Sequence, residues 1–225
     1  MIARHEQQEQ TSRARERQLA LERLFGPTTR EKRFDRCSFH NWQPRPGTEA
    51  AYQAARRYAR HLPRHLESGQ GLLLFGPPGS GKSHLAAAVS AAARDQGLTV
   101  LFQRVTALLS RLRSAYDPRP PVTESQLLSA LARADLLILD DAGAEKASPW
   151  TEQTFYTIID ERYSRQRPLI LTTNASLDRL AQQLGARTMD RLLEICQIVE
   201  NRGESYRREQ AFARLGQPPD QPPDH

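Results

Sequence analysis

The stretch GLLLFGPPGSGKSHLAAAV (residues 71–89) determines the fold that we expect for this chain. Its first five residues, 71–75, form an apolar run typical of a buried strand, and residues 82–97 read as a helix that ends at a glycine. Between them, GPPGSGKS (76–83) matches the pattern G-x-x-x-x-G-K-[ST]. A match in this position predicts a loop whose backbone N–H groups surround phosphates at a helix N-terminus.

The side chains of this loop predict ATP and Mg²⁺ as cofactors. We expect Lys82 to neutralise the β- and γ-phosphates and Ser83 to ligate the metal. Lys82 is one of three lysines among 32 basic residues, so a lysine at this place is informative. A glycine-rich turn without a ligand is the alternative. The expected nucleotide contacts are Gly76, Pro77, Pro78, Gly79, Ser80, Gly81, Lys82, Ser83 and His84.

Another apolar run, LLILDDAG (136–143), ends in two neighbouring aspartates. In a P-loop fold we expect this third strand to lie beside the first, so that its carboxyl end reaches the phosphate loop. Asp140 is then the candidate partner of Mg²⁺, directly or through water. We expect Asp141 to face the attacking water, as general base or orienting group. A capping or loop role is the alternative for Asp141.

The run PLILTTN (168–174) predicts a further neighbouring strand. Asn174 at its end is a candidate polar sensor that holds the attacking water or contacts the γ-phosphate. Thr172 and Thr173 are weaker candidates. Because asparagine after a strand is common in turns, a plain turn is the alternative.

Strands and helices alternate from residue 71, which predicts an α/β fold with a parallel sheet covered by helices on both faces. A helix at about 48–67 precedes the first strand. The five expected strands are 71–75, 98–103, 135–140, 168–173 and 195–200.

Composition narrows the function classes. A net charge of +6 and a pI near 9.7 suggest a polyanionic partner. Cys37 and Cys196 have no metal-binding spacing, so neither a disulfide framework nor a zinc site is expected. No apolar stretch reaches 18 residues. We therefore expect a cytoplasmic protein with no membrane partner.

Several segments together resemble a known family. They are CSFHNW (37–42), the phosphate loop with its helix, DLLILDDAG (135–143), LTTN (171–174), and LGARTMDRLLE (184–194) followed by NRGESYRR (201–208). In this order they resemble AAA+ ATPases, specifically the DnaC-type helicase loaders and the related IstB-type transposition ATPases. The resemblance covers about residues 35–208.

The resemblance implies self-association in a ring or spiral, with nucleotide sites between subunits. Arg191 matches the family's arginine finger, which contacts a neighbour's γ-phosphate, and Arg187 is a second candidate. Arg207 matches the sensor-2 arginine that acts on the nucleotide. The resemblance also implies that no separate C-terminal helical lid is present. The family usually has Asp-Glu or Asp-Asp at the strand end, and the shorter acid at Asp141 predicts slow hydrolysis.

The insertion between the second and third strands carries possible DNA contacts. The resemblance implies that its helix faces a central pore, where arginines would bind single-stranded phosphates and Tyr116 would stack on a base. A solvated helix face is the alternative. The arginines are Arg104, Arg111, Arg113 and Arg119. Phe39 and Trp42 lie in a linker, residues 37–47, that precedes the helix expected at about 48–67. They either frame the adenine or anchor this linker.

These expectations divide the chain into a short helical, partner-docking arm (1–35), an AAA+ core (36–208) and a disordered tail (209–225). The leading hypothesis is an ATP-dependent loader that binds single-stranded DNA and delivers a replicative helicase, with slow ATP hydrolysis. An IstB-type transposition ATPase is the main alternative. A small-molecule P-loop kinase and a nucleotide-gated binding module are alternatives from other classes.

Overall fold

The computed structural model describes residues 2–25, 34–115 and 122–216. At its centre lies a five-stranded, all-parallel sheet with the strand order β2-β3-β4-β1-β5. The predicted five-stranded parallel α/β fold is therefore confirmed. The strands are β1 (Gly71–Phe75), β2 (Val100–Arg104), β3 (Leu136–Ala142), β4 (Leu169–Thr173) and β5 (Cys196–Glu200).

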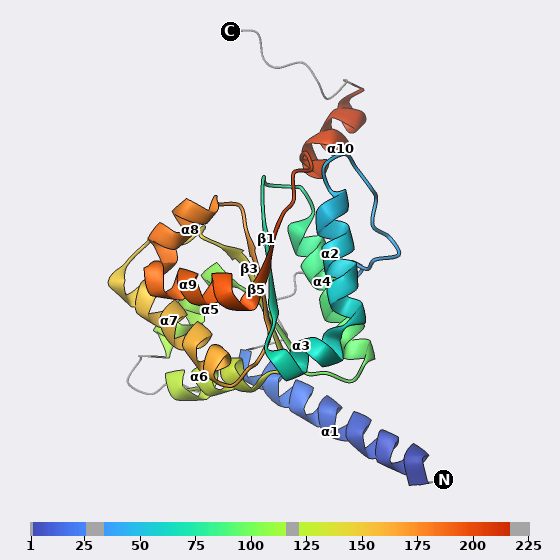
Figure 1. Cartoon of the computed structure of the whole chain (residues 1–225), viewed down its shortest axis with the longest axis vertical. Coiled ribbons are helices and arrows are strands. Elements are labelled where there is room, and N and C mark those ends of the chain that lie inside the picture. Colours follow the sequence, from blue (N-terminus) through green and yellow to red (C-terminus); the bar gives the residue numbers. More distant parts are fainter. Residues whose placement is uncertain (1, 26–33, 116–121, 217–225) are drawn as a thin grey trace.

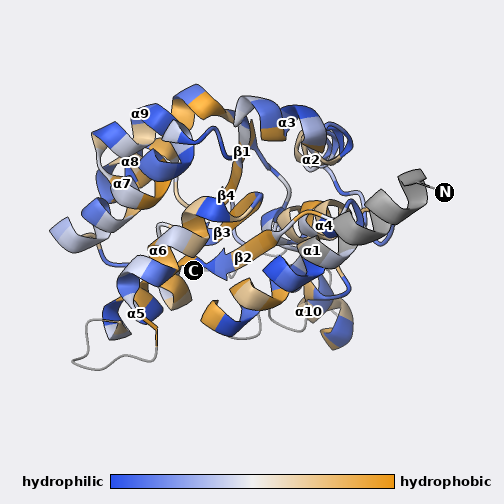
Figure 2. Cartoon of the chain, turned by 90° about the horizontal axis from the view of Figure 1, so that it is seen from below, coloured by the Kyte–Doolittle hydropathy of each residue, from blue (hydrophilic) through white to orange (hydrophobic). Residues whose placement is uncertain are grey.

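Helices cover both faces of the sheet, as Figure 1 shows. One layer contains α2 (Glu49–Arg60), α3 (Leu62–Ser68) and α4 (Lys82–Asp95); the other contains α5 (Val105–Ser114), α6 (Glu124–Arg133), α7 (Pro149–Ser164), α8 (Leu177–Leu184) and α9 (Ala186–Ile195). Successive strand residues enter opposite cores, since Leu72 and Leu74 pack with α2 and α4 while Leu73 packs on the other side. The strands are mostly apolar, and polar residues appear toward the carboxyl ends of β2, β3 and β4, as the blue end of β2 shows in Figure 2.

The sheet order corrects one expectation. We expected β3 to lie beside β1, but β4 lies between them and is paired in parallel with both. All five residues of β4 are buried, as a central strand covered on both faces requires. The carboxyl ends of β1, β4 and β3 therefore form one edge of the sheet, and β4 contributes side chains between the phosphate loop and the two aspartates.

The helix expected at about 48–67 is two helices. α2 ends at Arg60 and α3 begins at Leu62, with His61 between them in a non-helical conformation. Pro63 lies in the first turn of α3, where proline is tolerated because its missing N–H has no helical acceptor to lose. The chain changes direction at this point (Figure 1).

The N-terminal helix α1 (Ile2–Phe25) is partly built into the core. Leu21 and Phe25 are buried, and the side-chain amide of Gln18 bonds both backbone groups of Val100, donating to the carbonyl at 3.2 Å and accepting from the N–H at 3.0 Å. Val100 lies on β2, an edge strand whose outer backbone groups need partners. The second half of the expected docking arm thus covers a sheet edge.

At the other end, α10 (Tyr206–Leu215) follows β5. We expected a disordered tail from residue 209, and this predicted boundary is too early. Ser205 caps a helix that continues to Leu215. Residues 217–225 lie outside the described part of the chain. None of the described helices is long and apolar enough to cross a membrane.

Candidate nucleotide site

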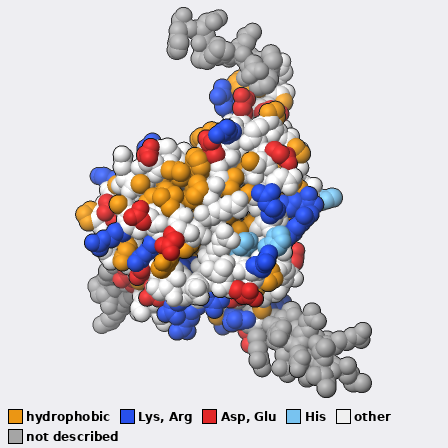
Figure 3. Space-filling view, in the orientation of Figure 1, with side chains coloured by type: hydrophobic (Ala, Val, Ile, Leu, Met, Phe, Trp, Pro, Cys, Tyr) orange, Lys and Arg blue, Asp and Glu red, His pale blue; other side chains and the backbone are white. Residues whose placement is uncertain are grey.

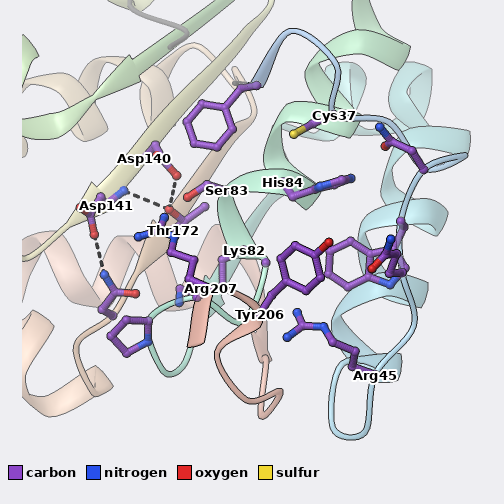
Figure 4. Close-up of a pocket in the computed structure, with 18 of the residues that line it drawn as sticks. Cys37, Arg45, Lys82, Ser83, His84, Asp140, Asp141, Thr172, Tyr206 and Arg207 are labelled. Carbon is purple, nitrogen blue, oxygen red and sulfur yellow. Dashed lines mark hydrogen bonds between the residues drawn. The ribbon is translucent and has the colours of Figure 1, made fainter. Parts of the chain in front are cut away.

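A cavity of about 570 Å³ lies at the carboxyl ends of β1, β3 and β4 (Figure 4). Its walls are formed by the phosphate loop, by the linker that precedes α2, and by residues of β3, β4 and α10. Of the sequence-predicted site residues, the cavity brings together Pro78, Gly79, Gly81, Lys82, Ser83, His84, Asp140, Asp141, Asn174 and Arg207. Gly76, Pro77 and Ser80 belong to the same loop but do not line the cavity. Residues far apart in the sequence therefore converge on one site.

The phosphate loop is held by close backbone approaches that require glycine. A Cβ atom on Gly76, at φ 139°, would lie 2.1 Å from the backbone oxygen of Asn201. A Cβ atom on Gly81, at φ 102°, would lie 2.5 Å from the indole of Trp42. Both positions are left-handed and crowded, so no other residue fits without a shift. Ser80 is fully buried, and its carbonyl accepts from Asn201 at 3.1 Å.

Lys82 is folded back onto its own loop. Its Nζ donates to the carbonyl oxygens of Gly76 at 2.9 Å and Pro77 at 2.8 Å, and lies 3.4 Å from the hydroxyl of Ser80. Burial lowers the pKa of Lys82 to about 8, although Asp141 and Asp140 act in the opposite direction. The ammonium is thus positioned at the loop and bonded to groups that phosphate oxygens can replace.

Asp140 has the environment expected of a metal partner. Its side chain is almost fully buried and accepts a 2.7 Å hydrogen bond from the hydroxyl of Thr172. Burial raises the pKa of Asp140, and hydrogen bonds with Thr172 and Ser83 lower it in part. Ser83 and Asp140 together offer hard oxygen ligands beside the phosphate loop, which fit Mg²⁺ with phosphates and waters completing its shell. The described residues contain no cluster of three or more His, Cys, Asp or Glu that would hold a metal without phosphate.

Asp141 and Asn174 form one unit. The amide of Asn174 donates to the Asp141 carboxylate at 2.7 Å, and the backbone N–H of Asp141 donates to the hydroxyl of Thr172 at 3.0 Å. Asp141 has a φ of 61°, where the register between β3 and β4 shifts. Non-glycine residues rarely adopt this conformation, and such strain is concentrated at functional sites. At this bend the carboxylate of Asp141 reaches Asn174, and Figure 4 shows Asp141 beside Asp140 and Thr172 at the cavity.

The linker supplies an aromatic wall. Trp42 stacks on Tyr52 with ring centroids 5.9 Å apart and meets the ring of His84 edge-on at 5.2 Å. Phe39 meets the ring of Tyr52 edge-on at 6.1 Å and does not line the cavity. Trp42 therefore anchors the linker and also lines the cavity, and its contact with an adenine stays a prediction.

Arg45 is a site residue that the sequence did not reveal. Its guanidinium donates to the carbonyls of Ser80 at 3.0 Å and Glu204 at 2.7 Å, and it lies over the ring of Tyr206 at 5.2 Å. It thereby joins the linker, the phosphate loop and the start of α10. Arg45 stands in a proline- and glycine-rich stretch with no motif, so no local signal marked it. Asn201 was also missed, although an asparagine after a strand was the signal used for Asn174.

The three arginines given roles on the nucleotide lie in different settings. Arg207 lines the cavity from α10, and its charge contributes to lowering the pKa of Lys82. Arg191 does not line its own chain's cavity; it is paired with Asp160 and lies over the rings of Tyr156 and Tyr163 on α7. Arg187, one turn earlier on α9, is exposed.

The arginines expected to bind single-stranded DNA do not share a surface. Arg104 lines the nucleotide cavity. Arg111 donates to the backbone carbonyl of Leu24 on α1, and Arg113 lies over the ring of Trp150 at 4.5 Å. Arg119 and Tyr116 lie outside the described residues. Among the described candidates, Arg104 therefore faces the nucleotide cavity, and Arg111 and Arg113 contact other parts of the fold.

Comparisons with known proteins agree with this site. A family model for the IstB-like ATP binding protein matches residues 7–213. The replicative helicase loader DnaC of Escherichia coli is 30% identical over 177 residues, which are 78% of this chain and 71% of the loader. A putative insertion sequence ATP-binding protein of Sinorhizobium fredii is 39% identical over 157 residues, 65% of this chain and 50% of that protein.

Solved structures give the same fold. The crystal structure of the DnaC helicase loader superimposes with a TM-score of 0.68 at 27% identity, covering 76% of this chain and 99% of that one. AMPPCP-bound DnaA from Aquifex aeolicus gives 0.64 at 18% identity, over 81% of this chain and 56% of that one, a likeness of fold alone. The matched family model and the loader's identity together establish that this chain belongs to the family of IstB-like ATP-binding proteins, which includes AAA+ helicase-loader relatives.

Proposed function

We propose that this protein is an ATP-dependent helicase loader that binds single-stranded DNA, delivers a replicative helicase and hydrolyses ATP slowly. The observation that carries the proposal is the convergence of Lys82, Ser83, Asp140 and the Asp141–Asn174 pair on one cavity. The identity with a replicative helicase loader, which covers most of both chains, favours this task.

The chemistry follows from where the side chains lie. Lys82 exchanges the carbonyls of Gly76 and Pro77 for phosphate oxygens when nucleotide binds. Ser83 and Asp140 would hold Mg²⁺, and the ion would neutralise charge on the phosphates. Asp141, held by Asn174, orients a water for attack on the γ-phosphorus and accepts its proton as the bond to the leaving oxygen breaks. Strained and shorter than glutamate, Asp141 makes a slow base.

The family resemblance implies that an arginine from a neighbouring subunit acts at this phosphate. Arg191 is the proposed finger, but it must leave Asp160 and two tyrosine rings to reach a neighbour. Exposed Arg187 is the alternative. The test mixes inactive Asp141→Asn subunits with Arg187→Ala or Arg191→Ala subunits. The finger is the arginine whose variant is inactive alone and regains hydrolysis when mixed with Asp141→Asn subunits, which still supply the missing arginine.

Delivery of a helicase is tested by loading. Purified protein with a hexameric replicative helicase and single-stranded circular DNA should increase the helicase bound to DNA, and only with ATP. Protein lacking residues 1–11, at the start of the expected docking arm, should hydrolyse ATP but load less helicase if this part docks the partner. No helicase binding and no change in loading would refute the proposal.

An IstB-type transposition accessory ATPase is the second candidate. The match to the IstB-like family model and the 39% identity to an insertion-sequence ATP-binding protein favour it. In that case ATP hydrolysis should rise with double-stranded DNA, and the protein should bind a transposase rather than a helicase.

A further inference from the structure

A dense group of basic residues lies on α2 and α3, away from the nucleotide cavity. Residues 56–65 contain four arginines and two histidines, with no Asp or Glu among them. The break between the two helices at His61 turns Arg57, His61, Arg64 and His65 around a cleft of about 570 Å³. Figure 3 shows Lys/Arg and His side chains gathered over these helices.

The four arginines of this group have no carboxylate partner among the described residues, whereas the ring of His61 bonds the backbone carbonyl of Arg57 at 2.9 Å. No ion pair joins Arg56, Arg57, Arg60 or Arg64 to a carboxylate among the described residues, and Glu67 is the one acid that lines the cleft. Other arginines are neutralised, as in the pairs Arg165–Glu161, Arg167–Asp135 and Arg202–Glu200.

The arrangement works against the stability of the helix. Arg56 and Arg60 are like charges four residues apart, a spacing at which they repel. Burial lowers the pKa of His65, and the nearby His61 and Arg64 lower it further, as expected in a positive field. A surface that repels itself in isolation is stabilised by an anion with several charges.

We propose that this α2–α3 surface binds the phosphate backbone of duplex DNA. Arginine forks bind phosphate oxygens well, and Ser68, Gln70 and Gln197 supply further polar groups along the cleft. A single-strand site would need exposed aromatic rings for base stacking. The aromatic ring in this cleft, Tyr58, is 2% exposed and stacked on His65 at 4.1 Å, so it offers no platform for a base.

The location keeps the two sites apart. Gln70 directly precedes β1, and Gln197 lies near the start of β5, so the cleft lies at the amino ends of these two strands. The phosphate loop of the nucleotide cavity follows the opposite, carboxyl end of β1. A five-residue strand separates them by about 16 Å. Duplex DNA bound here therefore leaves the ATP site open. This inference goes beyond the proposed loader, which requires single-stranded DNA only. For the transposition candidate, it names the surface that would hold the duplex.

The test uses full-length Arg57→Ala/Arg60→Ala/Arg64→Ala protein. These residues are exposed, and alanine favours helix, so the fold should persist. The matched control, Arg133→Ala/Arg165→Ala/Arg179→Ala, removes the same charge from exposed positions within helices or, for Arg165, at the C-cap of α7. Fluorescence anisotropy of a labelled duplex about three helical turns long measures affinity over a series of salt concentrations.

The α2–α3 variant should bind the duplex at least ~10-fold more weakly, with a log–log salt slope reduced by about 0.9 for each phosphate that is no longer neutralised. The control variant should keep most of the affinity, and ATP hydrolysis without DNA should be unchanged in both. Equal affinity losses in the two variants would overturn the proposal, because the loss would then depend on net charge alone.

Two further measurements distinguish duplex binding from membrane binding and from helicase loading. Vesicles containing phosphatidylserine test a membrane surface; arginine-dependent vesicle binding with unchanged duplex binding would overturn the proposal. Helicase loading onto single-stranded circles tests the proposed function separately. Loss of duplex binding by the α2–α3 variant with intact helicase loading supports the proposed surface. Failure of the wild-type protein to load helicase refutes the loader proposal but does not affect the duplex-binding result.

Discussion

The hydroxyl of Thr172 on β4 donates a 2.7 Å hydrogen bond to the carboxylate of Asp140 on β3. The same oxygen accepts the backbone N–H of Asp141 at 3.0 Å. One buried hydroxyl therefore fixes both neighbouring acids: it orients the candidate metal ligand and holds the strained backbone of the candidate base. Because β4 lies between β1 and β3, this hydroxyl stands between the acids and the phosphate loop.

Replacing Thr172 with valine should slow hydrolysis and leave nucleotide affinity nearly unchanged. Valine keeps the shape but removes both hydrogen bonds, and loss of such a supporting contact costs roughly 10–100-fold in activity at metal sites. Single-turnover phosphate release measures the effect. Thr157→Val is the control, because its hydroxyl bonds only its own helix at Gln153. Equal rates in the two variants would show that Thr172 does not support the site.

ATP affinity should fall as the pH rises through about 8. Burial lowers the pKa of Lys82 to about 8, so the ammonium is present below this pH and is progressively lost above it. Bound phosphates favour the charged form, so binding above pH 8 should take up a proton. Calorimetry in buffers of different ionisation enthalpy measures this uptake. An affinity independent of pH up to about 9 would contradict the low pKa.

The two cysteines should report on the cavity. Cys37 lines the cavity and is half-buried, whereas Cys196 is buried and burial raises the pKa of its thiol to about 12. A thiol reagent should therefore label Cys37 alone, and ATP should slow the labelling. Intact-mass spectrometry counts the labels, and Cys37→Ser identifies the site. Labelling at an unchanged rate with saturating ATP would mean that nucleotide does not occupy this cavity.

Arg162 should be a large contributor to stability. Its guanidinium is fully buried and donates to the backbone carbonyls of Leu131, Ala134 and Pro168, with Asp135 at the limit of hydrogen-bond distance. Arg162→Ala leaves these carbonyls without donors and opens a cavity, which should cost about 3–5 kcal/mol. Arg165→Ala, an exposed change one turn on, should cost under about 1 kcal/mol. Chemical denaturation compares the two; similar midpoints would contradict the buried role.

The sequence predicted the elements better than their arrangement. Local patterns located all five strands, the phosphate loop and the acids Asp140 and Asp141, because strand burial and glycine-rich turns depend on nearby residues. They did not reveal that β4 separates β1 from β3, since strand order depends on long-range packing. Nor could they reveal that Gln18 pairs with Val100, 82 residues away, or that Arg45 reaches Ser80.

Arginine roles were the hardest to predict. Arg111 and Arg113 lie on a helix whose basic residues suggested DNA binding. In the structure Arg111 bonds the carbonyl of Leu24, and Arg113 lies over the ring of Trp150. Arg57 and Arg64 belong to no sequence motif. They line one cleft because the chain turns between α2 and α3. Charge in a sequence shows how many cations are available, and the fold decides which remain unpaired.

The central claim is that ATP is hydrolysed at the edge of the sheet that carries Asp140 and Asp141. Single-turnover hydrolysis by Asp141→Asn protein tests this claim most directly. Asparagine keeps the size of the side chain but cannot accept the proton of the attacking water. We predict ATP binding within about threefold of wild type, with hydrolysis reduced at least ~100-fold, while the exposed control Asp95→Asn hydrolyses normally. Wild-type hydrolysis by Asp141→Asn would contradict the assignment.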